Sequence, residues 1–162
     1  MSAMREHKTP VWERAEVIAH SQLLLGSFRA RVGRDLMDCS GHPQGDAKAL
    51  YEAPFALLSH GTQDDPILNY GNETALRLWE MDFTAFTAMP SRLTAQPMLR
   101  EERQRLLETA ARKGYIDDYA GIRISRTGKL FRIENVILWT ITDKVGVSHG
   151  QAAFFDRWTP QE

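Results

Sequence analysis

The hydrophobic and polar positions divide the chain into a helical beginning and a sheet-rich end. After Pro10, apolar residues recur at three- and four-residue steps over residues 11–37, a spacing typical of an amphipathic helix. Gly26 and Gly33 interrupt this stretch, so the pattern allows one bent helix or two shorter ones. The apolar stripe of this segment needs a partner, either the chain's own sheet or a second copy, and consists of Val17, Leu24, Phe28, Val32 and Leu36.

A segment rich in Gly, Pro, Asp and Ser follows, and it predicts a linker or long loop over residues 39–52. Residues 55–59 and 66–72 are short apolar strands on either side of the turn sequence GTQDDP, which indicates a β-hairpin. A short helix comes next, with Asn72 as its predicted N-cap. The prolines of DFTAFTAMPSRLTAQP then predict irregular structure or single helical turns.

The second half of the chain predicts one longer helix and three strands. The helix covers residues 99–113, ends at Gly114, and has a narrow apolar stripe of Leu99, Leu106, Leu107 and Ala110. The strands are YIDDYAGIRIS, LFRIENVILWTIT and QAAFFDRW, separated by the turns RTGK and DKVGVSHG. Two hairpin regions separated by helices are typical of an α+β domain with one antiparallel sheet.

One polar residue interrupts the apolar row of the long strand FRIENVILWTI. Alternate counting places Asn135 on one face with Phe131, Ile133, Ile137, Trp139 and Ile141. A buried amide without hydrogen-bond partners costs roughly 1–3 kcal/mol. Either a β-bulge turns Asn135 toward solvent or a neighbouring strand, or the amide lines a pocket and contacts a ligand. Gln151 favours the pocket, because it could lie beside Asn135 across the ladder.

Three further side chains are candidates for the same pocket. Trp139 and Phe131 are expected in the core, and they would be stacking surfaces for a planar ligand. Arg92 could bind an anionic group through its guanidinium, although a solvated charged face is the competing interpretation. The predicted ligand-binding residues are therefore Asn135, Gln151, Trp139, Phe131 and Arg92.

Composition narrows the class of protein and its compartment. The chain has 162 residues and a net charge of −1, so no global field favours nucleic acid or an anionic membrane. No run of about 18 apolar residues occurs, and the N-terminus lacks a secretory apolar core. The single cysteine, Cys39, excludes an internal disulfide and fits a reducing compartment. We therefore expect a cytoplasmic protein that binds neither nucleic acid nor membrane.

The sequence predicts no catalytic residues and no metal ligands. Asp64 and Asp65 lie with His60 near the turn GTQDDP, where Asp before Pro is ordinary turn chemistry. His42 and His149 lie in glycine-flanked loops without metal-ligand spacing. A nucleophile elbow, a phosphate-binding glycine loop and a dinucleotide fingerprint are absent from the sequence. We therefore expect a protein that is not an enzyme.

The order of predicted elements resembles the PAS fold, a five-stranded antiparallel sheet with short helices on its concave face. ILNYGNETALRLWEMD is similar to the PAS segment in which a strand ends in Asn and leads into a short helix. Residues 114–158 resemble the MEKHLA domain, a PAS-like module, and the shared features are Gly121, Ile122, Ser125, Gly128, Trp139 and Trp158. The chain is identified as a member of the bacterial branch of that family.

This resemblance covers residues 53–158 and gives the expected domain organisation. A helical extension occupies residues 1–38, a linker residues 39–52, and the PAS-like domain residues 53–159. Membership implies a sensory or regulatory module that binds a small apolar or planar ligand, a protein partner, or both, without catalysis. It also implies a homodimer through the N-terminal helix, since flanking helices of PAS proteins commonly pair.

Two alternatives stay open. MPSRLTAQP is similar to the cysteine-bearing segment of light-oxygen-voltage domains, with Ser91 at the photoreactive cysteine, Arg92 at the phosphate, and Asn135 and Gln151 at the flavin ring. Serine has no thiolate, so this resemblance implies flavin redox chemistry without the photoadduct. No cofactor is otherwise required. The second alternative is a small enzyme similar in shape to ketosteroid isomerase, which needs an acid–base pair inside the sheet.

Overall fold

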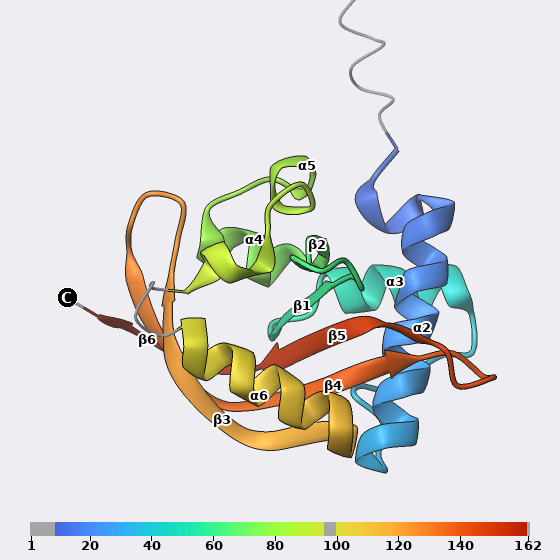
Figure 1. Cartoon of the computed structure of the whole chain (residues 1–162). Helices are drawn as coiled ribbons and strands as arrows, with labels where there is room; N and C mark the ends of the chain where they lie inside the picture. Colours follow the sequence, from blue (N-terminus) through green and yellow to red (C-terminus); the bar gives the residue numbers. More distant parts are fainter. Residues whose placement is uncertain (1–8, 96–99, 162) are drawn as a thin grey trace, which may run out of the picture.

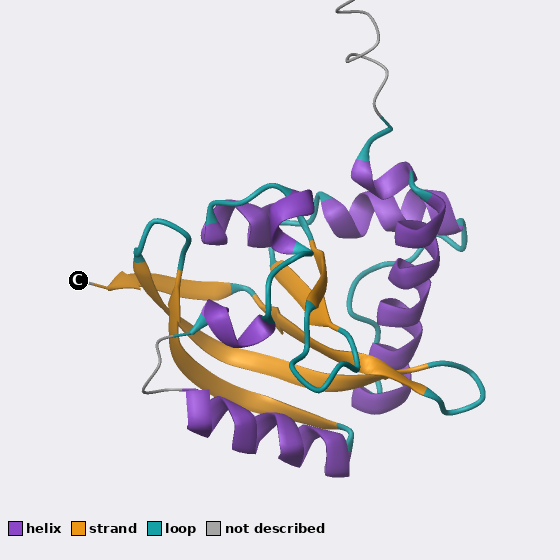
Figure 2. Cartoon of the chain, turned by 45° about the horizontal axis from the view of Figure 1, so that its top comes forward, coloured by secondary structure: helices purple, strands orange, loops and turns teal. Residues whose placement is uncertain are grey.

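The computed structural model describes residues 9–95 and 100–161, and shows one antiparallel sheet with helices on both faces (Figure 1, Figure 2). The helices and 3₁₀ turns are η1 (Val11–Glu13), α2 (Ala15–Val32), α3 (Pro43–Tyr51), α4 (Glu73–Trp79), α5 (Phe83–Phe86), η2 (Ser91–Thr94) and α6 (Arg100–Lys113). The strands are β1 (Ala56–His60), β2 (Leu68–Gly71), β3 (Tyr115–Ile124), β4 (Leu130–Thr142), β5 (Ser148–Phe155) and β6 (Arg157–Gln161). None of the described helices is long and apolar enough to cross a bilayer.

The strand order β2-β1-β5-β4-β3 confirms the predicted α+β class, with the β1–β2 hairpin at one edge. A sixth strand, β6, was not predicted. It pairs with β4 from Leu130↔Gln161 to Glu134↔Arg157, along the side of β4 that β5 occupies further on. Pro160 explains the omission, because a residue without a backbone N–H is usually a signal against a strand.

The N-terminal helix α2 lies on the outer face of the sheet and packs across β4 (Figure 1). Its stripe residues Val17, Leu24 and Phe28 are buried against the sheet, so the helix folds back on its own chain. A 3₁₀ turn precedes it, and it ends at Gly33 with a φ of 89°. The sheet supplies the opposite half of this core through Leu57, Tyr70, Ile137, Trp139, Ile141 and Ala152.

Residues 43–51 form helix α3, and the prediction of a linker or loop there is wrong. Pro43 occupies the first turn, where the missing N–H costs no helical hydrogen bond. Ala47 and Leu50 bury one face of the helix. The buried Asp46 carboxylate accepts hydrogen bonds from the backbone N and the Oγ of Ser40, at 2.7 and 2.8 Å. Pro43 and Asp46 therefore belong to the first turn of a helix and not to a loop, and the domain boundaries stay a prediction.

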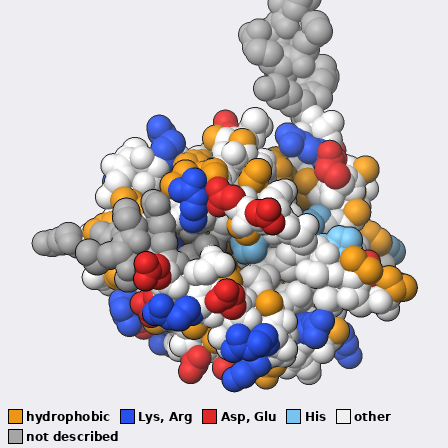
Figure 3. Space-filling view, in the orientation of Figure 1, with side chains coloured by type: hydrophobic (Ala, Val, Ile, Leu, Met, Phe, Trp, Pro, Cys, Tyr) orange, Lys and Arg blue, Asp and Glu red, His pale blue; other side chains and the backbone are white. Residues whose placement is uncertain are grey.

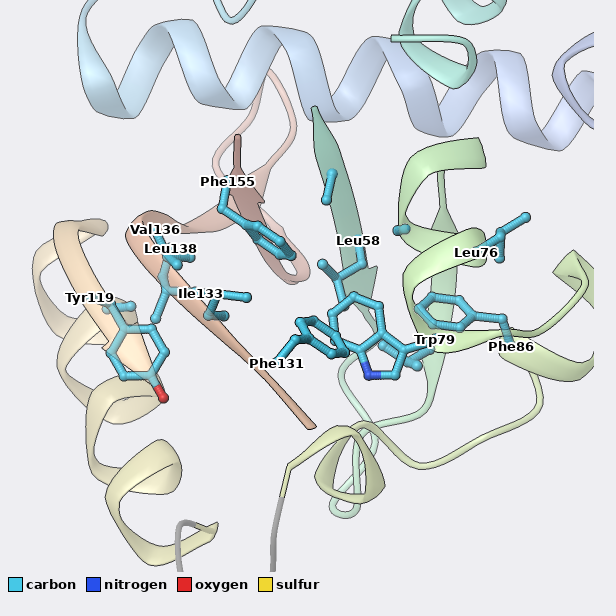
Figure 4. Packing of buried hydrophobic residues seen from close by; sticks show 14 residues of the cluster. Leu58, Leu76, Trp79, Phe86, Tyr119, Phe131, Ile133, Val136, Leu138 and Phe155 are labelled. Carbon is cyan, nitrogen blue, oxygen red and sulfur yellow. The ribbon is translucent and has the colours of Figure 1, made fainter. Parts of the chain in front are cut away.

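The inner face of the sheet carries a second core beneath α4, α5, η2 and α6 (Figure 4). Trp79 on α4 is its central aromatic residue, and it makes a T-shaped contact with Phe131 at 5.1 Å between ring centroids. Charged side chains of both signs cover the surface over α6, as its predicted solvent-facing side requires (Figure 3). Leu99, part of the predicted stripe, lies outside the described residues, whereas Ala110 is buried.

Asn135 lies in a β-bulge of β4 and is exposed, so the alternative of a shifted register is confirmed. The pair Tyr119↔Val136 is followed by Gly121↔Ile133, which sets three steps on β4 against two on β3. The extra residue adopts a left-handed conformation, with a φ of 53° at Asn135. The strand is therefore not one continuous face: its first part and Val136 face the inner core, whereas Trp139 faces α2.

Candidate functional site

A cavity of about 40 Å³ lies between the inner face of the sheet and the helices that cover it. Its walls are mainly apolar and include Leu58, Leu68, Ile133, Val136, Leu138 and Phe155. Its polar lining comes from His60, Ser91, Thr94, Tyr119, Arg123 and Gln151. One water needs about 10–15 Å³ on this measure, so the space suits a molecule of a few heavy atoms. Drug-sized ligands occupy about 300–1,000 Å³.

Arg123 and Tyr119 form a polar pair on β3 at the cavity. Arg123 Nη2 donates to Tyr119 Oη at 2.8 Å, and Nη1 donates to the Ile122 carbonyl at 2.9 Å. Arg123 is 5% exposed, which is rare for a guanidinium. Gly121 makes this arrangement fit, because a Cβ there would lie 2.5 Å from Tyr119 Oη and 3.2 Å from Arg123 Nη1. The glycine therefore leaves room for two polar groups over the sheet.

Gln151 on β5 joins the cavity to a surface groove. Its Nε2 donates to the carbonyl of Leu107 on α6 at 2.8 Å. Gln151, Leu107 and His60 line both the interior cavity and a neighbouring groove of about 270 Å³. These three residues therefore form the wall between the two spaces, and the bond between Gln151 and Leu107 holds part of that wall closed.

Of the other predicted site residues, Phe131 lies beside the cavity, whereas Trp139, Asn135 and Arg92 lie apart from it. Phe131 is buried in the inner core beside it. Trp139 faces α2, where its Nε1 donates to Ser27 Oγ at 2.9 Å, so its predicted place in the pocket is wrong. Asn135 is exposed at the bulge, which corrects its predicted position. Arg92 is also exposed and pairs with Asp65 at 3.2 Å, which supports the solvated interpretation.

Sequence reasoning missed Tyr119 and Arg123, although a signal was present. Tyr119, Gly121 and Arg123 follow one another at the two-residue period of a single strand face. An arginine in register with inward-facing residues is as anomalous as an inward-facing amide. Ser91, at the position similar to the photoreactive cysteine, is buried and lines the cavity.

The described lining of the cavity contains no Asp or Glu. Asp117 and Asp118 on β3 are exposed, and Glu134 lies in the bulge region of β4. A carboxylate acid–base pair of the kind that the isomerase alternative requires is therefore missing from the described part of the site. Within residues 9–95 and 100–161, no group of three or more His, Cys, Asp or Glu side chains could hold a metal ion.

The arrangement of sheet, inner helices and cavity is that of a PAS domain. The PAS domain of a protein from Colwellia psychrerythraea has a TM-score of 0.61 at 15% identity, over 68% of this chain and 92% of that chain. An RNA-binding light-oxygen-voltage receptor gives 0.59 at 17% identity, over 75% and 36%. A PAS domain in complex with ethanol, from a LuxR-family transcriptional regulator of Burkholderia thailandensis, gives 0.51 at 16% identity, over 66% and 92%. At these identities the likeness establishes the fold.

The family follows from the sequence itself. The model of the MEKHLA domain matches residues 18–160, and the chain therefore belongs to the MEKHLA domain family. The match begins inside α2 and so extends well beyond the predicted residues 53–158. It shows the family without distinguishing a bacterial branch. No curated protein matches the chain.

Proposed function

We propose that this chain is a cytoplasmic sensory or regulatory module that binds a small molecule and signals to a protein partner without catalysing a reaction. The observation that carries the proposal is the interior cavity, which combines apolar walls with a few polar groups on a PAS fold. The solved PAS domain in complex with ethanol supports the idea that a domain of this fold binds very small molecules.

Strand β4 offers a route from the cavity to the outer helix. Val136 and Leu138 line the cavity, whereas Ile137 and Trp139 belong to the core shared with α2. A ligand that favours one packing of β4 therefore also favours one position of α2, which is a population shift. Packing of this kind transmits small displacements because a close-packed interior has low compressibility.

The flavin alternative finds less support in the site. A cavity of about 40 Å³ does not accommodate an isoalloxazine ring unless the covering helices move. Of the four residues similar to flavin-contacting positions, Ser91 and Gln151 line the cavity, whereas Arg92 and Asn135 are exposed elsewhere. An absorption spectrum of the freshly purified protein tests this alternative directly.

The homodimer through the N-terminal helix stays a proposal, but the surface that a second copy would contact differs from the predicted one. The apolar stripe of α2 is buried by its own sheet, so a second copy has access only to the outer side of the helix. That side is weakly apolar, with Ala19, Gln22, Gly26 and Ala30. Native mass spectrometry reports the oligomeric state and any retained small molecule together.

The ligand-binding part is tested by a thermal-shift panel of alcohols, amides and acids with two to six carbons. Binders should raise the melting temperature of the native protein. Ala153→Val adds two methyl carbons at the cavity wall and should abolish that rise, whereas the matched variant Ala88→Val changes an exposed residue and should retain it. A panel without any binder, or with shifts unaffected by Ala153→Val, would remove the cavity as the sensing site.

A further inference from the structure

The cavity contains a buried cation without a carboxylate partner. The guanidinium of Arg123 is a cation, and its side chain is almost completely removed from solvent. No Asp or Glu side chain of the described residues forms an ion pair with it. A buried charge is normally paired, because desolvation without a counter-charge is costly. The site is therefore electrostatically prepared for an anion.

The groups around Arg123 favour an acceptor. Tyr119 Oη already accepts from Nη2, so its own hydroxyl hydrogen is available for donation. The hydrogen bonds of Arg123 to the Ile122 carbonyl and to Tyr119 Oη use one N–H on Nη1 and one on Nη2, of the five N–H groups that a guanidinium carries. Gly121 has no side chain, so Tyr119 Oη and Arg123 Nη1 can lie close together above the strand. The pair thus presents several donors side by side, which is the arrangement that a carboxylate accepts in a bidentate manner.

The rest of the cavity restricts the anion further. Among the described residues, no second Lys or Arg lines the cavity. Arg123 therefore balances the charge of a monoanion but not that of a dianion. Ile133, Val136 and Leu138 supply an apolar wall that suits an alkyl group better than the oxygens of an inorganic anion. The volume of about 40 Å³ admits only a few heavy atoms.

We infer, on the basis of the proposed sensory function, that the cavity binds a short-chain monocarboxylate. Its carboxylate pairs with Arg123 and Tyr119, and its alkyl tail lies against Ile133, Val136 and Leu138. Tyr119, Val136, Leu138 and Ile133 converge on the same side of the sheet in Figure 4. Acids with two to four carbons match the available space. Gln151 and Leu107, joined by a hydrogen bond, separate this site from the surface groove.

Isothermal titration calorimetry of the full chain tests this inference with propionate as the probe, propionamide as its neutral isostere, and sodium chloride at equal ionic strength as a control. Propionate should bind at least about tenfold more tightly than propionamide, since charge-assisted hydrogen bonds are stronger than neutral ones. Arg123→Gln should reduce propionate affinity to that of propionamide. The matched variant Arg132→Gln, an exposed arginine on β4, should leave it unchanged.

A second variant keeps the test decisive if Arg123→Gln does not fold. Tyr119→Phe retains the ring beneath the guanidinium and removes only the hydroxyl, and it should weaken propionate roughly threefold to tenfold. Equal affinity for propionate and propionamide, or full propionate affinity in the folded Tyr119→Phe and Arg123→Gln variants, would overturn the carboxylate assignment. If propionamide or propan-1-ol binds without any preference for the acid, the ligand class is wrong and the sensory proposal stands. If no compound binds, both fail.

Discussion

The indole Nε1 of Trp139 donates a hydrogen bond to Ser27 Oγ at 2.9 Å, and so joins the central strand β4 to helix α2 inside a buried core. The ring also meets Phe28 edge-on, with 4.9 Å between the ring centroids. Leu138 and Val136 of the same strand line the cavity, so this contact lies on the proposed route from the cavity to the outer helix.

Ser27→Ala leaves the buried indole N–H without its acceptor, so we expect a loss of about 1–3 kcal/mol in the free energy of unfolding. Trp139→Phe removes the donor and part of the ring volume, and should cost more. A urea-denaturation double-mutant cycle isolates the pair, with an expected coupling of about 1 kcal/mol. Strict additivity of the two substitutions would show that the hydrogen bond adds nothing beyond packing.

Asn72→Ala should be among the most destabilising single changes in the chain. The buried side chain caps α4 by accepting from Ala75 N at 3.1 Å and also accepts from Leu57 N at 3.1 Å. Its Nδ2 donates to the carbonyls of Leu50 and Phe55, at 3.2 and 2.8 Å. Alanine removes all four hydrogen bonds, and we expect a loss above about 3 kcal/mol in denaturant unfolding.

Asp82, which also caps a helix through its side chain, is the matched control for Asn72. Asp82 is exposed and accepts one bond, from Ala85 N at 2.8 Å, so Asp82→Ala should cost only about 1 kcal/mol. Similar losses for the two variants would contradict the view that Asn72 organises the β2–α4 junction through more than its cap.

Substitutions of Asn135 should change the stability of the protein through backbone strain and not through loss of side-chain contacts. Asn tolerates the left-handed conformation that the bulge imposes, whereas Ala does not. Asn135→Ala should therefore lower the free energy of unfolding by about 1 kcal/mol, and Asn135→Gly should be neutral or stabilising. Arg132→Ala provides an exposed control on the same strand without a positive φ. A Gly variant as unstable as the Ala variant would argue for a side-chain role.

The protonation of His20 should make the stability of the protein depend on pH. Burial, and secondarily the charge of His149, lowers the pKa of His20 from its ordinary value of 6.5 to about 4. Between these values the unfolded chain binds a proton that the folded chain refuses, so stability rises with pH in this window. As the pH falls from 6.5 to 4, up to about 3 kcal/mol is lost.

His20→Gln should flatten the unfolding free energy between pH 4 and 6.5, apart from slopes due to other groups. The variant perturbs the contact of His20 Nε2 with Ser59 Oγ, 2.9 Å in the native protein, so the slope and not the absolute stability is the readout. His42→Gln, at an exposed position, should retain the native slope. An NMR titration that places the His20 pKa near 6.5 in the folded protein would refute the prediction.

The elements that the sequence predicted correctly are those fixed by neighbouring residues. The cap at Asn72, the end of α6 at Gly114 and the β1–β2 hairpin all depend on local backbone preferences. The face of Asn135 does not, because the bulge exists only through the pairing of β4 with β3. An alternation count along one strand contains no information about its partner's register.

The candidate site was predicted only in part for a similar reason. Gln151 was predicted at the cavity and Phe131 beside it. Both predictions hold because the two-residue alternation is unbroken between each residue and the inward-facing residues next to it on the same strand. Trp139 was assigned to the wrong face by the same register error. Arg123 was overlooked because an arginine is expected in solvent, and only the three-dimensional arrangement shows how Gly121 makes room for it.

The single inserted residue at Asn135 also constrains how the gene for this chain can vary in length. Removing one codon within β4 would exchange the two faces on one side of the deletion: it would expose Ile133 and bury its charged neighbours, or move Trp139 from the α2 side into the inner core. The turns at residues 125–129 and 143–147 join the same strands without this phase requirement. Insertions and deletions should therefore accumulate at the two turns and be absent from the strand between them.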